Sequence, residues 1–327
     1  MIVPQFWAEA RRHQPRQKGQ QQISVRRFGW SETSQSEAEQ MAAQRAEEAF
    51  KRIISGEKLA RREPKIGYNG AQGVPIREEI LSRHRDVVIT RNAYGAHCLN
   101  TPDVLFADID FDQTIGYRMV LIHAIILMAV AIGFGVWLHS VAITVVAGIL
   151  ALGLAYPATK FTQNMLLKMR GGPENRAQER VKEFVLKNPD WNLRLYRTPA
   201  GFRIMAMQAV FDPQDPKVAD FFTAMAVDPV YATMCRNQHC FRARVSPKPW
   251  RIGIREHMRP RPGVWPVNES QKAVRNEWIR GYEATSTGFA SCRFVEVIGS
   301  SIVHPKAETV RDLHDRLSQA LSGRNIA

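Results

Sequence analysis

Three aspartates alternate with apolar residues in one short stretch, Asp108-Ile109-Asp110-Phe111-Asp112, which follows the apolar residues 104–107. This pattern is typical of a strand end, and because side chains alternate on a strand the three carboxylates share one face. Clustered carboxylates repel one another unless a cation or basic groups neutralise them. Mg²⁺ and Mn²⁺ prefer such oxygen ligands. We therefore predict a Mg²⁺ or Mn²⁺ site on Asp108 and Asp110, able to clamp a transferring phosphoryl group.

A basic segment later in the chain offers the opposite charge. Between residues 236 and 261 a single acid, Glu256, stands against eight basic side chains: Arg236, Arg242, Arg244, Lys248, Arg251, Arg255, Arg259 and Arg261. With Trp250 among them, the segment suits polyanions. Three interpretations stay open: anionic lipid or a solvated face, nucleotide or nucleic acid, and internal pairing with the acids. For the second interpretation we predict phosphate contacts from four residues: Arg197, Arg203, Lys248 and Arg251.

Two further motifs give the region a resemblance to a known family. Gly201-Phe202-Arg203 lies between two predicted strands, and Val295-Glu296 lies on a late strand. With Asp108 and Asp110, this order resembles the catalytic core of archaeo-eukaryotic primase-polymerases. Their first motif is Asp-x-Asp, their second has His where this chain has Arg203, and their third is an acid. The resemblance implies a metal-dependent nucleotidyl- or phosphoryl-transferase on an RRM-like sheet over residues 100–300, with Glu296 as the third metal ligand.

Other candidate sites carry less chemistry. Cys235 and Cys240 have no second pair at zinc-binding spacing, so we expect no zinc site there. His314 lies beside apolar positions of a predicted helix, which predicts a surface or capping role. Residues 92–100, which include Tyr94, form a pocket candidate beside the acidic strand. Phosphate-binding loops, dinucleotide fingerprints and hydrolase elbows are missing from the sequence.

The elements that must position these residues are interrupted by an apolar segment. Residues 119–157 contain no charged side chain, although the whole chain carries a formal charge of +14. As one helix, the segment would be about 58 Å long, nearly twice the bilayer core of roughly 30 Å. We therefore predict two transmembrane helices, 119–138 and 141–157, joined at His139-Ser140. The small residues Gly133, Gly135, Gly148 and Gly153 should allow the helices to approach closely.

Basic residues flank both ends of this hairpin. Arg118 precedes it, while Lys160 and Lys168 follow it, and the turn is uncharged. The positive-inside rule then places both termini in the cytoplasm. The hairpin, together with the phrases YRTPAG and SPKPWRIG, is similar to bacterial membrane-hairpin proteins whose function is not known. The predicted location is the bacterial inner (cytoplasmic) membrane, with the lipid bilayer as one partner.

Outside the hairpin, strands and helices mix. Strands are predicted at 22–28, 86–90, 104–111, 192–198, 202–208, 241–245, 251–254 and 292–298, and helices begin near Ser34, Pro173, Pro216, Asn268 and Pro305. This order predicts an α+β class: a mixed sheet with flanking helices, interrupted by a two-helix transmembrane hairpin. Residues 1–118 and 158–327 should form the two parts of one cytoplasmic domain around the hairpin, 119–157.

Two functional hypotheses follow. The first is a membrane-anchored cytoplasmic protein that binds a phosphate-bearing ligand, nucleotide or nucleic acid, with a divalent metal on Asp108 and Asp110. The alternative is a non-enzymatic membrane scaffold whose basic surface lies on anionic lipid. A primase-polymerase-like nucleotidyltransferase is a further alternative. In the scaffold, the acids should be paired with arginines.

Overall fold

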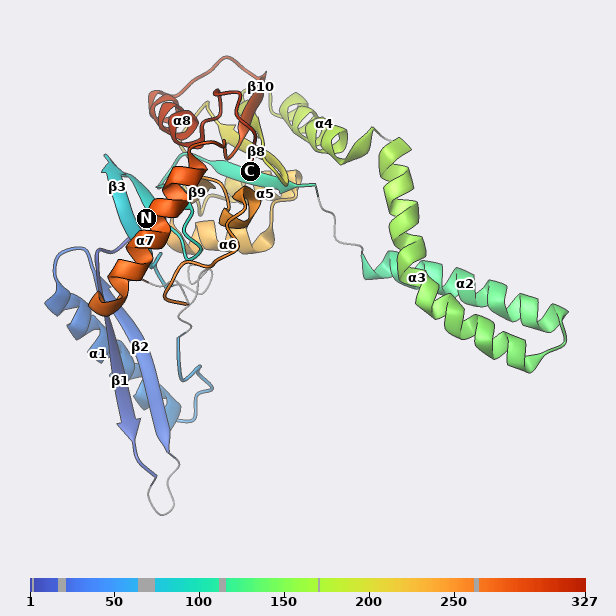
Figure 1. The fold of residues 1–327 in the computed structure, drawn as a ribbon, viewed down its shortest axis with the longest axis horizontal. Coiled ribbons are helices and arrows are strands. Elements are labelled where there is room, and N and C mark those ends of the chain that lie inside the picture. The colour runs from blue at the N-terminus through green and yellow to red at the C-terminus, as the bar shows by residue number, and fades with distance from the viewer. Residues whose placement is uncertain (2, 17–21, 64–73, 112–115, 170, 262–264) are drawn as a thin grey trace. The chain divides into compact units, whose positions relative to one another are not determined.

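The chain forms two compact units in the computed structural model (Figure 1). The structure describes residues 1, 3–16, 22–63, 74–111, 116–169, 171–261 and 265–327. The α+β unit comprises residues 1–109, 185–199 and 203–327, and the hairpin unit comprises residues 110–184 and 200–202. The predicted class, mixed α+β with flanking helices and an apolar helical hairpin, is confirmed.

The chain begins with a two-stranded ribbon covered by a helix. Strands β1 (Phe6–Gln14) and β2 (Ile23–Ser31) pair antiparallel, and α1 (Gln35–Ile54) packs against both. A Cβ atom at Gly29 would lie 2.1 Å from the carbonyl oxygen of Ala38, so glycine is what lets α1 approach β2 this closely. The predicted cap at Ser34 is confirmed, because its side chain accepts a hydrogen bond from the first turn of α1.

A four-stranded antiparallel sheet joins the two halves of the sequence. Its order is β3 (Glu79–His84), β4 (Val87–Arg91), β5 (His97–Thr101) and β9 (Phe241–Arg244). Strand β5 covers the second half of residues 92–100, which we expected to connect two strands, so only the first half of this segment is a connection. The polar side chains of β5 are bonded inside the sheet: the Asn100 amide donates to the Val88 carbonyl at 2.9 Å and to the Thr90 hydroxyl at 3.0 Å.

A second four-stranded sheet carries the acidic motif. Its order is β10 (Arg293–Gly299), β7 (Asn192–Arg197), β8 (Gly201–Ala206) and β6 (Phe106–Asp110). Strands β10 and β7 are antiparallel, with an irregularity between Phe294 and Glu296. Strand β6 precedes the hairpin and β8 follows it, so this sheet also combines both flanks of the sequence.

The remaining helices of the C-terminal half begin mostly at proline. They are α4 (Gly172–Lys187), α5 (Pro216–Met225), α6 (Pro229–Gln238), α7 (Glu269–Ser286) and α8 (Pro305–Ser318). Proline fits the first turn because its missing N–H would have no helical partner there. The strand that we predicted over 251–254 is wrong: residues Pro249–Ile252 form a 3₁₀ turn, η2, which ends at Gly253 with a φ of 85°.

The hairpin unit contains two helices long and apolar enough to cross a membrane, α2 (Tyr117–Trp137) and α3 (Val141–Met169). The second helix continues through Pro157 to Met169, beyond the predicted apolar span 141–157. The two helices are antiparallel neighbours: a Cβ atom at Gly135 would lie 1.9 Å from the Thr144 hydroxyl, and the His123 ring contacts the Thr162 hydroxyl at 3.3 Å.

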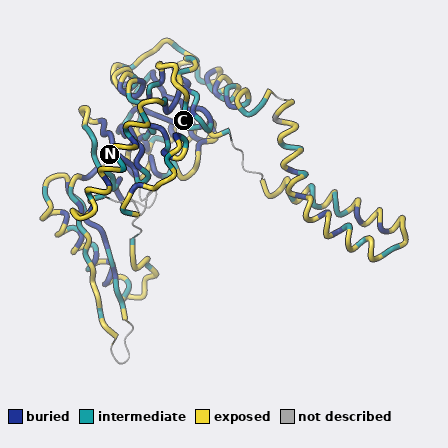
Figure 2. Tube along the Cα trace, in the orientation of Figure 1, coloured by how far each residue is buried: buried dark blue, intermediate teal, exposed yellow. Residues whose placement is uncertain are grey.

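Small residues line the contact between α2 and α3. Ala131, Ala151 and Ala155 are among the few buried side chains of the hairpin, whereas most of its large apolar side chains are exposed (Figure 2). Of the four predicted glycines, Gly135 and Gly148 meet atoms of the opposite helix. A Cβ atom at Gly133 or Gly153 would have no such neighbour within 4 Å, so these two do not contribute to the contact.

Candidate functional site

A bidentate ion pair joins the acidic strand to its neighbour. Arg203 on β8 donates to Asp108 on β6 through Nε to Oδ1 at 2.8 Å and through Nη2 to Oδ2 at 3.0 Å. Its third nitrogen, Nη1, donates to the Arg244 carbonyl at 2.6 Å. The Arg203 side chain is 1% exposed and the Asp108 side chain is 44% exposed. Asp108 is thus paired with an arginine, as expected for the scaffold hypothesis. Within the basic segment itself, internal pairing holds for Arg242, which lies 2.7 Å from Glu78.

The same guanidinium begins a buried polar chain that reaches α8. Its Nη1 lies 3.5 Å from Nε2 of His314, whose Nδ1 lies 3.1 Å from Oδ1 of Asp315. The Asp315 carboxylate also accepts from the Tyr196 hydroxyl at 2.6 Å and from Arg194 at 2.7 Å. His314 is fully buried, so the surface role predicted for it is wrong. Polar partners on β7 and β8 make its burial possible.

A thiol lies next to this histidine. The Cys292 sulfur is 3.9 Å from His314 Nε2, which gives a cysteine, histidine and aspartate in the order used by nucleophilic enzymes. Burial would raise the pKa of Cys292, but His314 outweighs it and the pKa is lowered. Burial would lower the pKa of His314, but Cys292 and Asp315 raise it. Cys292 and His314 have no exposed surface, so this arrangement stabilises the fold rather than meeting a substrate.

The electrostatics of Asp108 follow from its position. Burial would raise its pKa, but Arg203 outweighs burial, with smaller contributions from Arg244 and His314, and the pKa is lowered. A carboxyl group with a lowered pKa stabilises the folded state above its ordinary pKa, and that stabilisation is lost as the pH falls through the folded value. Asp108 is thus a stable anion at neutral pH, already neutralised by a protein cation.

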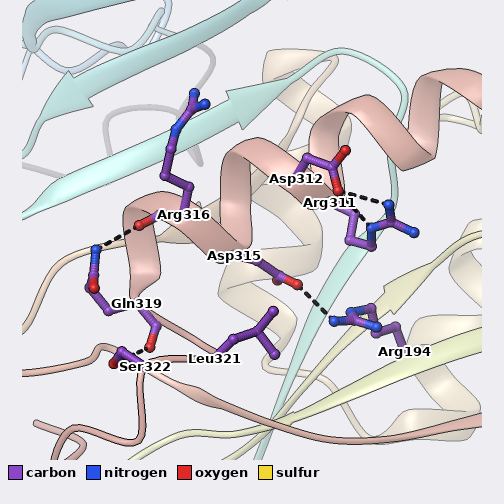
Figure 3. A pocket seen from close by; sticks show the side chains of 8 residues that line it. All are labelled: Arg194, Arg311, Asp312, Asp315, Arg316, Gln319, Leu321 and Ser322. Carbon is purple, nitrogen blue, oxygen red and sulfur yellow. Dashed lines mark hydrogen bonds and ion pairs between the residues drawn. The ribbon is translucent and has the colours of Figure 1, made fainter.

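The buried chain ends at a pocket beside α8. The pocket has a volume of about 620 Å³ and is lined by Arg194, Arg311, Asp312, Asp315, Arg316, Gln319, Leu321 and Ser322 (Figure 3). Two of its arginines are already paired with acids: Arg194 with Asp315, and Arg311 with Asp312, each at 2.7 Å. These pairs leave little net charge for an anionic ligand.

The three carboxylates predicted to share a metal do not come together. Strands β6 and β10 are the opposite edges of their sheet. Three strand spacings therefore separate Glu296 from Asp108, about 14 Å. Asp110 is exposed at the end of β6, and Asp112 lies outside the described residues. In the described part of the chain, no group of three or more His, Cys, Asp or Glu side chains is placed to hold a metal ion.

The prediction that Glu296 shares a metal site with Asp108 and Asp110 is therefore wrong. The reason is topological, since β7 and β8 lie between the two edge strands. A Mg²⁺ or Mn²⁺ ion on Asp108 and Asp110 alone stays a prediction. Arg203 supplies the neutralising charge for Asp108 without one.

Two of the predicted phosphate contacts adjoin an exposed aromatic surface. Trp250 is 53% exposed, the Lys248 ammonium lies 5.3 Å from its ring centre, and Tyr94 meets it edge-on at 5.2 Å. Burial raises the pKa of Tyr94, opposed by a hydrogen bond from Arg244. Arg251 follows Trp250 in η2. Residues 244, 248, 250, 251 and Tyr94 are called the Trp250 surface below.

The other two predicted phosphate contacts lie elsewhere. Arg203 is buried against Asp108, and Arg197 ends β7, where it donates to the Thr198 carbonyl. Sequence analysis missed the pairing of Tyr94 with Trp250, because 155 intervening residues hide it. The available signal was the tryptophan between Lys248 and Arg251 in SPKPWRIG, of which the side chain is exposed.

The segment predicted to be a pocket also contains a buried histidine. His97 Nε2 lies 3.1 Å from Arg91 Nη1 and 3.7 Å from the Glu283 carboxylate on α7. Burial, helped by the charge of Arg91, lowers the pKa of His97 to about 4. The ring is therefore neutral near pH 7 and accepts a hydrogen bond from Arg91. This contact holds β5 to β4 and offers no ligand site.

Comparisons with protein-family models, with curated proteins and with solved structures find no match to this chain.

Proposed function

We propose that the hairpin anchors the chain in the bacterial inner membrane, with both termini in the cytoplasm, and that the α+β unit binds a phosphate-bearing ligand with an aromatic base. The length and apolar character of α2 and α3 support the anchoring. The contact between His123 and Thr162 supports the orientation, because it brings Arg118 and Lys168 to the same end of the hairpin.

The Trp250 surface carries the proposal for the ligand. An indole ring that is half exposed, with a cation over it and a second aromatic ring at its edge, can stack on a base. On this proposal, Lys248 and Arg251, the cations on either side of Trp250 in the sequence, contact the phosphates of the same ligand. Arg203, which is paired with Asp108, donates a hydrogen bond to the backbone carbonyl of Arg244 and so helps to hold this residue of the surface in position.

The test is ligand binding by the full chain in detergent micelles. ATP and a short single-stranded DNA serve as probes in isothermal titration calorimetry. Stacking on an aromatic ring contributes about 1–3 kcal/mol per base, so Trp250→Ala should weaken binding by roughly tenfold. Lys248→Gln should weaken it less. Arg197→Gln is the matched control, because this arginine lies on β7 away from the Trp250 surface, and it should bind like the wild type.

Equal affinity of the wild type and Trp250→Ala for both probes would reject the Trp250 surface as the ligand site. If Arg197→Gln and Lys248→Gln weaken binding of the probes equally, the loss reflects the overall positive charge of the chain and not a site at the Trp250 surface.

The scaffold on anionic lipid is the second candidate. Two observations favour it. Asp108 is paired with Arg203, as expected for the scaffold, and three arginines after the Trp250 surface are exposed, Arg255, Arg259 and Arg261. Such exposed arginines gain about 1 kcal/mol per basic residue near an anionic leaflet. In nanodiscs, trypsin should then cleave after Arg255 more slowly with phosphatidylglycerol than with phosphatidylcholine; Arg259 and Arg261 precede proline and resist trypsin in both lipids. Equal rates would exclude the scaffold.

A further inference from the structure

The helix α3 is longer than its partner in the hairpin. Its 29 residues correspond to about 43 Å, whereas the 21 residues of α2 correspond to about 31 Å, close to the thickness of a bilayer core. Both helices adjoin the turn at residues 138–140, so the excess length of α3 lies at its C-terminal end. About 12 Å of this helix therefore extends beyond the start of α2.

Contacts between the two helices show where their pairing ends. A Cβ atom at Gly135 would meet Thr144, and a Cβ atom at Gly148 would lie 3.4 Å from the sulfur of Met128. Counted along both helices from these two contacts, the first residue of α2 is level with residues 159–162 of α3.

The contact of His123 with Thr162 agrees with this register. The His123 ring is bonded to the Met119 carbonyl at 2.9 Å, one turn nearer the start of α2, and meets the Thr162 hydroxyl there. Thr159 is the last buried side chain of α3 among those that the structure describes. Residues 161–169 thus lie beyond the paired part of the hairpin, and they are called the α3 extension below.

The α3 extension exposes an apolar face. Phe161, Met165 and Met169 recur at every fourth position, and each is more than half exposed. Residues four apart lie on one face of a helix, whereas Gln163 and Asn164 fall on the opposite face. The extension is therefore amphipathic, although no described part of the chain covers its apolar side.

Pro157 allows this extension to leave the axis of the paired part. It has no N–H to donate to the Gly153 carbonyl, and prolines inside helices cause kinks. Figure 1 shows that α3 bends close to the start of α2. A helix that bends where it leaves the bilayer can lie along the membrane surface.

The charges of this region favour an anionic membrane surface. Lys160 and Lys168 are both exposed, and no acidic residue occurs between positions 113 and 173. Lys160 is level with the start of α2, and Lys168 borders the apolar face, two helical turns after Phe161. Both ammonium groups can therefore reach lipid headgroups while the apolar face meets the acyl chains.

We infer that the α3 extension lies in the headgroup region of the cytoplasmic leaflet as an interfacial helix, with Phe161, Met165 and Met169 between the acyl chains. Lys160 and Lys168 contact the phosphates of anionic lipids. The occupant of the apolar face is lipid rather than a second copy of the chain, because the extension continues a helix that leaves the bilayer at this level and carries only positive charge. This inference rests on the membrane anchoring proposed above.

Spin-label accessibility tests this placement on the full chain in nanodiscs of phosphatidylglycerol and phosphatidylcholine. The four native cysteines are buried, so a nitroxide reagent labels a cysteine introduced at an exposed site. The probes are molecular oxygen, which concentrates in lipid, and a nickel chelate, which stays in water. The ratio of oxygen to nickel collisions should be severalfold larger in Met165→Cys than in Asn164→Cys, the matched control on the polar face.

Two results would overturn the inference. Equal collision ratios in Met165→Cys and Asn164→Cys would mean that the extension stands in water. Protection of the Met165→Cys label from both probes would mean that protein covers the apolar face, and dipolar broadening between labels would identify that protein as a second copy of the chain.

A third variant separates this inference from the anchoring. Leu152 is exposed in the middle of the paired part of α3, so the Leu152→Cys label should meet oxygen and not nickel. Access of nickel to this label would contradict the anchoring itself. A label in lipid at Leu152→Cys, with equal ratios in the other two variants, would contradict only the interfacial helix.

Discussion

The hairpin and the sheet beneath α8 bury different kinds of side chain. Between α2 and α3 the contact is made by small residues such as Ala131, Gly135 and Ala155, while large apolar residues face outward. Beneath α8, the α+β unit buries Arg203, His314 and other charged or polar groups, each with a named partner. The charged residues of the hairpin helices, Arg118, Lys160 and Lys168, thus lie outside the apolar segment 119–157, whereas the sheet buries charged side chains.

The difference fits the membrane anchoring proposed for the hairpin. Apolar surface exposed by the hairpin is inexpensive in lipid, where close packing of small residues is what holds helices together. In water, the α+β unit gains stability by covering apolar residues, and the guanidinium that it buries at Arg203 has hydrogen-bond acceptors for all three of its nitrogens. The two regions should therefore respond differently to loss of charge, to added volume and to pH.

The largest expected loss of stability follows from removing the carboxylate of Asp108. Asp108→Ala strands a buried guanidinium and should lower the free energy of unfolding by about 3–5 kcal/mol. Arg203→Met should cost less, because the Asp108 side chain is 44% exposed and its carboxylate can be solvated. Urea unfolding of the full chain in detergent, followed by circular dichroism, measures both. A larger loss for Arg203→Met would show that packing, not charge, dominates this contact.

Added volume should affect the hairpin only on its contact face. Gly135→Val places side-chain atoms against Thr144 and should cost about 1–3 kcal/mol. Gly133→Val, two residues earlier, meets no atoms of α3 and is the matched control. Titration with sodium dodecyl sulfate, followed by the helical signal, compares the two variants. Equal destabilisation would mean that the α2/α3 contact is different in the membrane.

The smallest expected effect is a pH dependence confined to the α+β unit. Because the folded pKa of His97 is about 4, below its ordinary value of 6.5, the unfolded chain takes up this proton first. Stability is therefore lost as the pH falls, by about 1.5 kcal/mol between roughly pH 6.5 and 5. His97→Gln should show a correspondingly shallower pH dependence of urea unfolding. Identical slopes for the two proteins would exclude His97 as the cause.

Long-range pairing limited what could be predicted from the sequence. The hairpin, the acidic strand and the Ser34 cap depend on neighbouring residues, and the sequence predicts all three. Strand β5 was missed because its buried Asn100 is polar, and the groups that satisfy it lie on β4 and β9. The burial of His314 depends on Arg203, which is 111 residues away.

The candidate site was predicted only in part, because its contacts also join residues that are far apart in the sequence. Asp108 and Arg203 were singled out separately from local motifs, yet their mutual pairing required β6 and β8 to be neighbours. Glu296 was grouped with them because sequence order does not show that two strands intervene. Lys248 adjoins the Trp250 surface because of a local turn, but Tyr94 reaches it only through the tertiary fold.

The insertion of residues 110–184 between β6 and β8 has a consequence for biosynthesis. Strands β5 and β6 leave the ribosome first, but their partners β9 and β8 are translated only after the hairpin and α4. Until β8 and β9 are translated, one edge of each strand has unpaired backbone N–H and C=O groups, which favours aggregation. The two sheets of the α+β unit therefore cannot be completed until the second half of the chain has been translated.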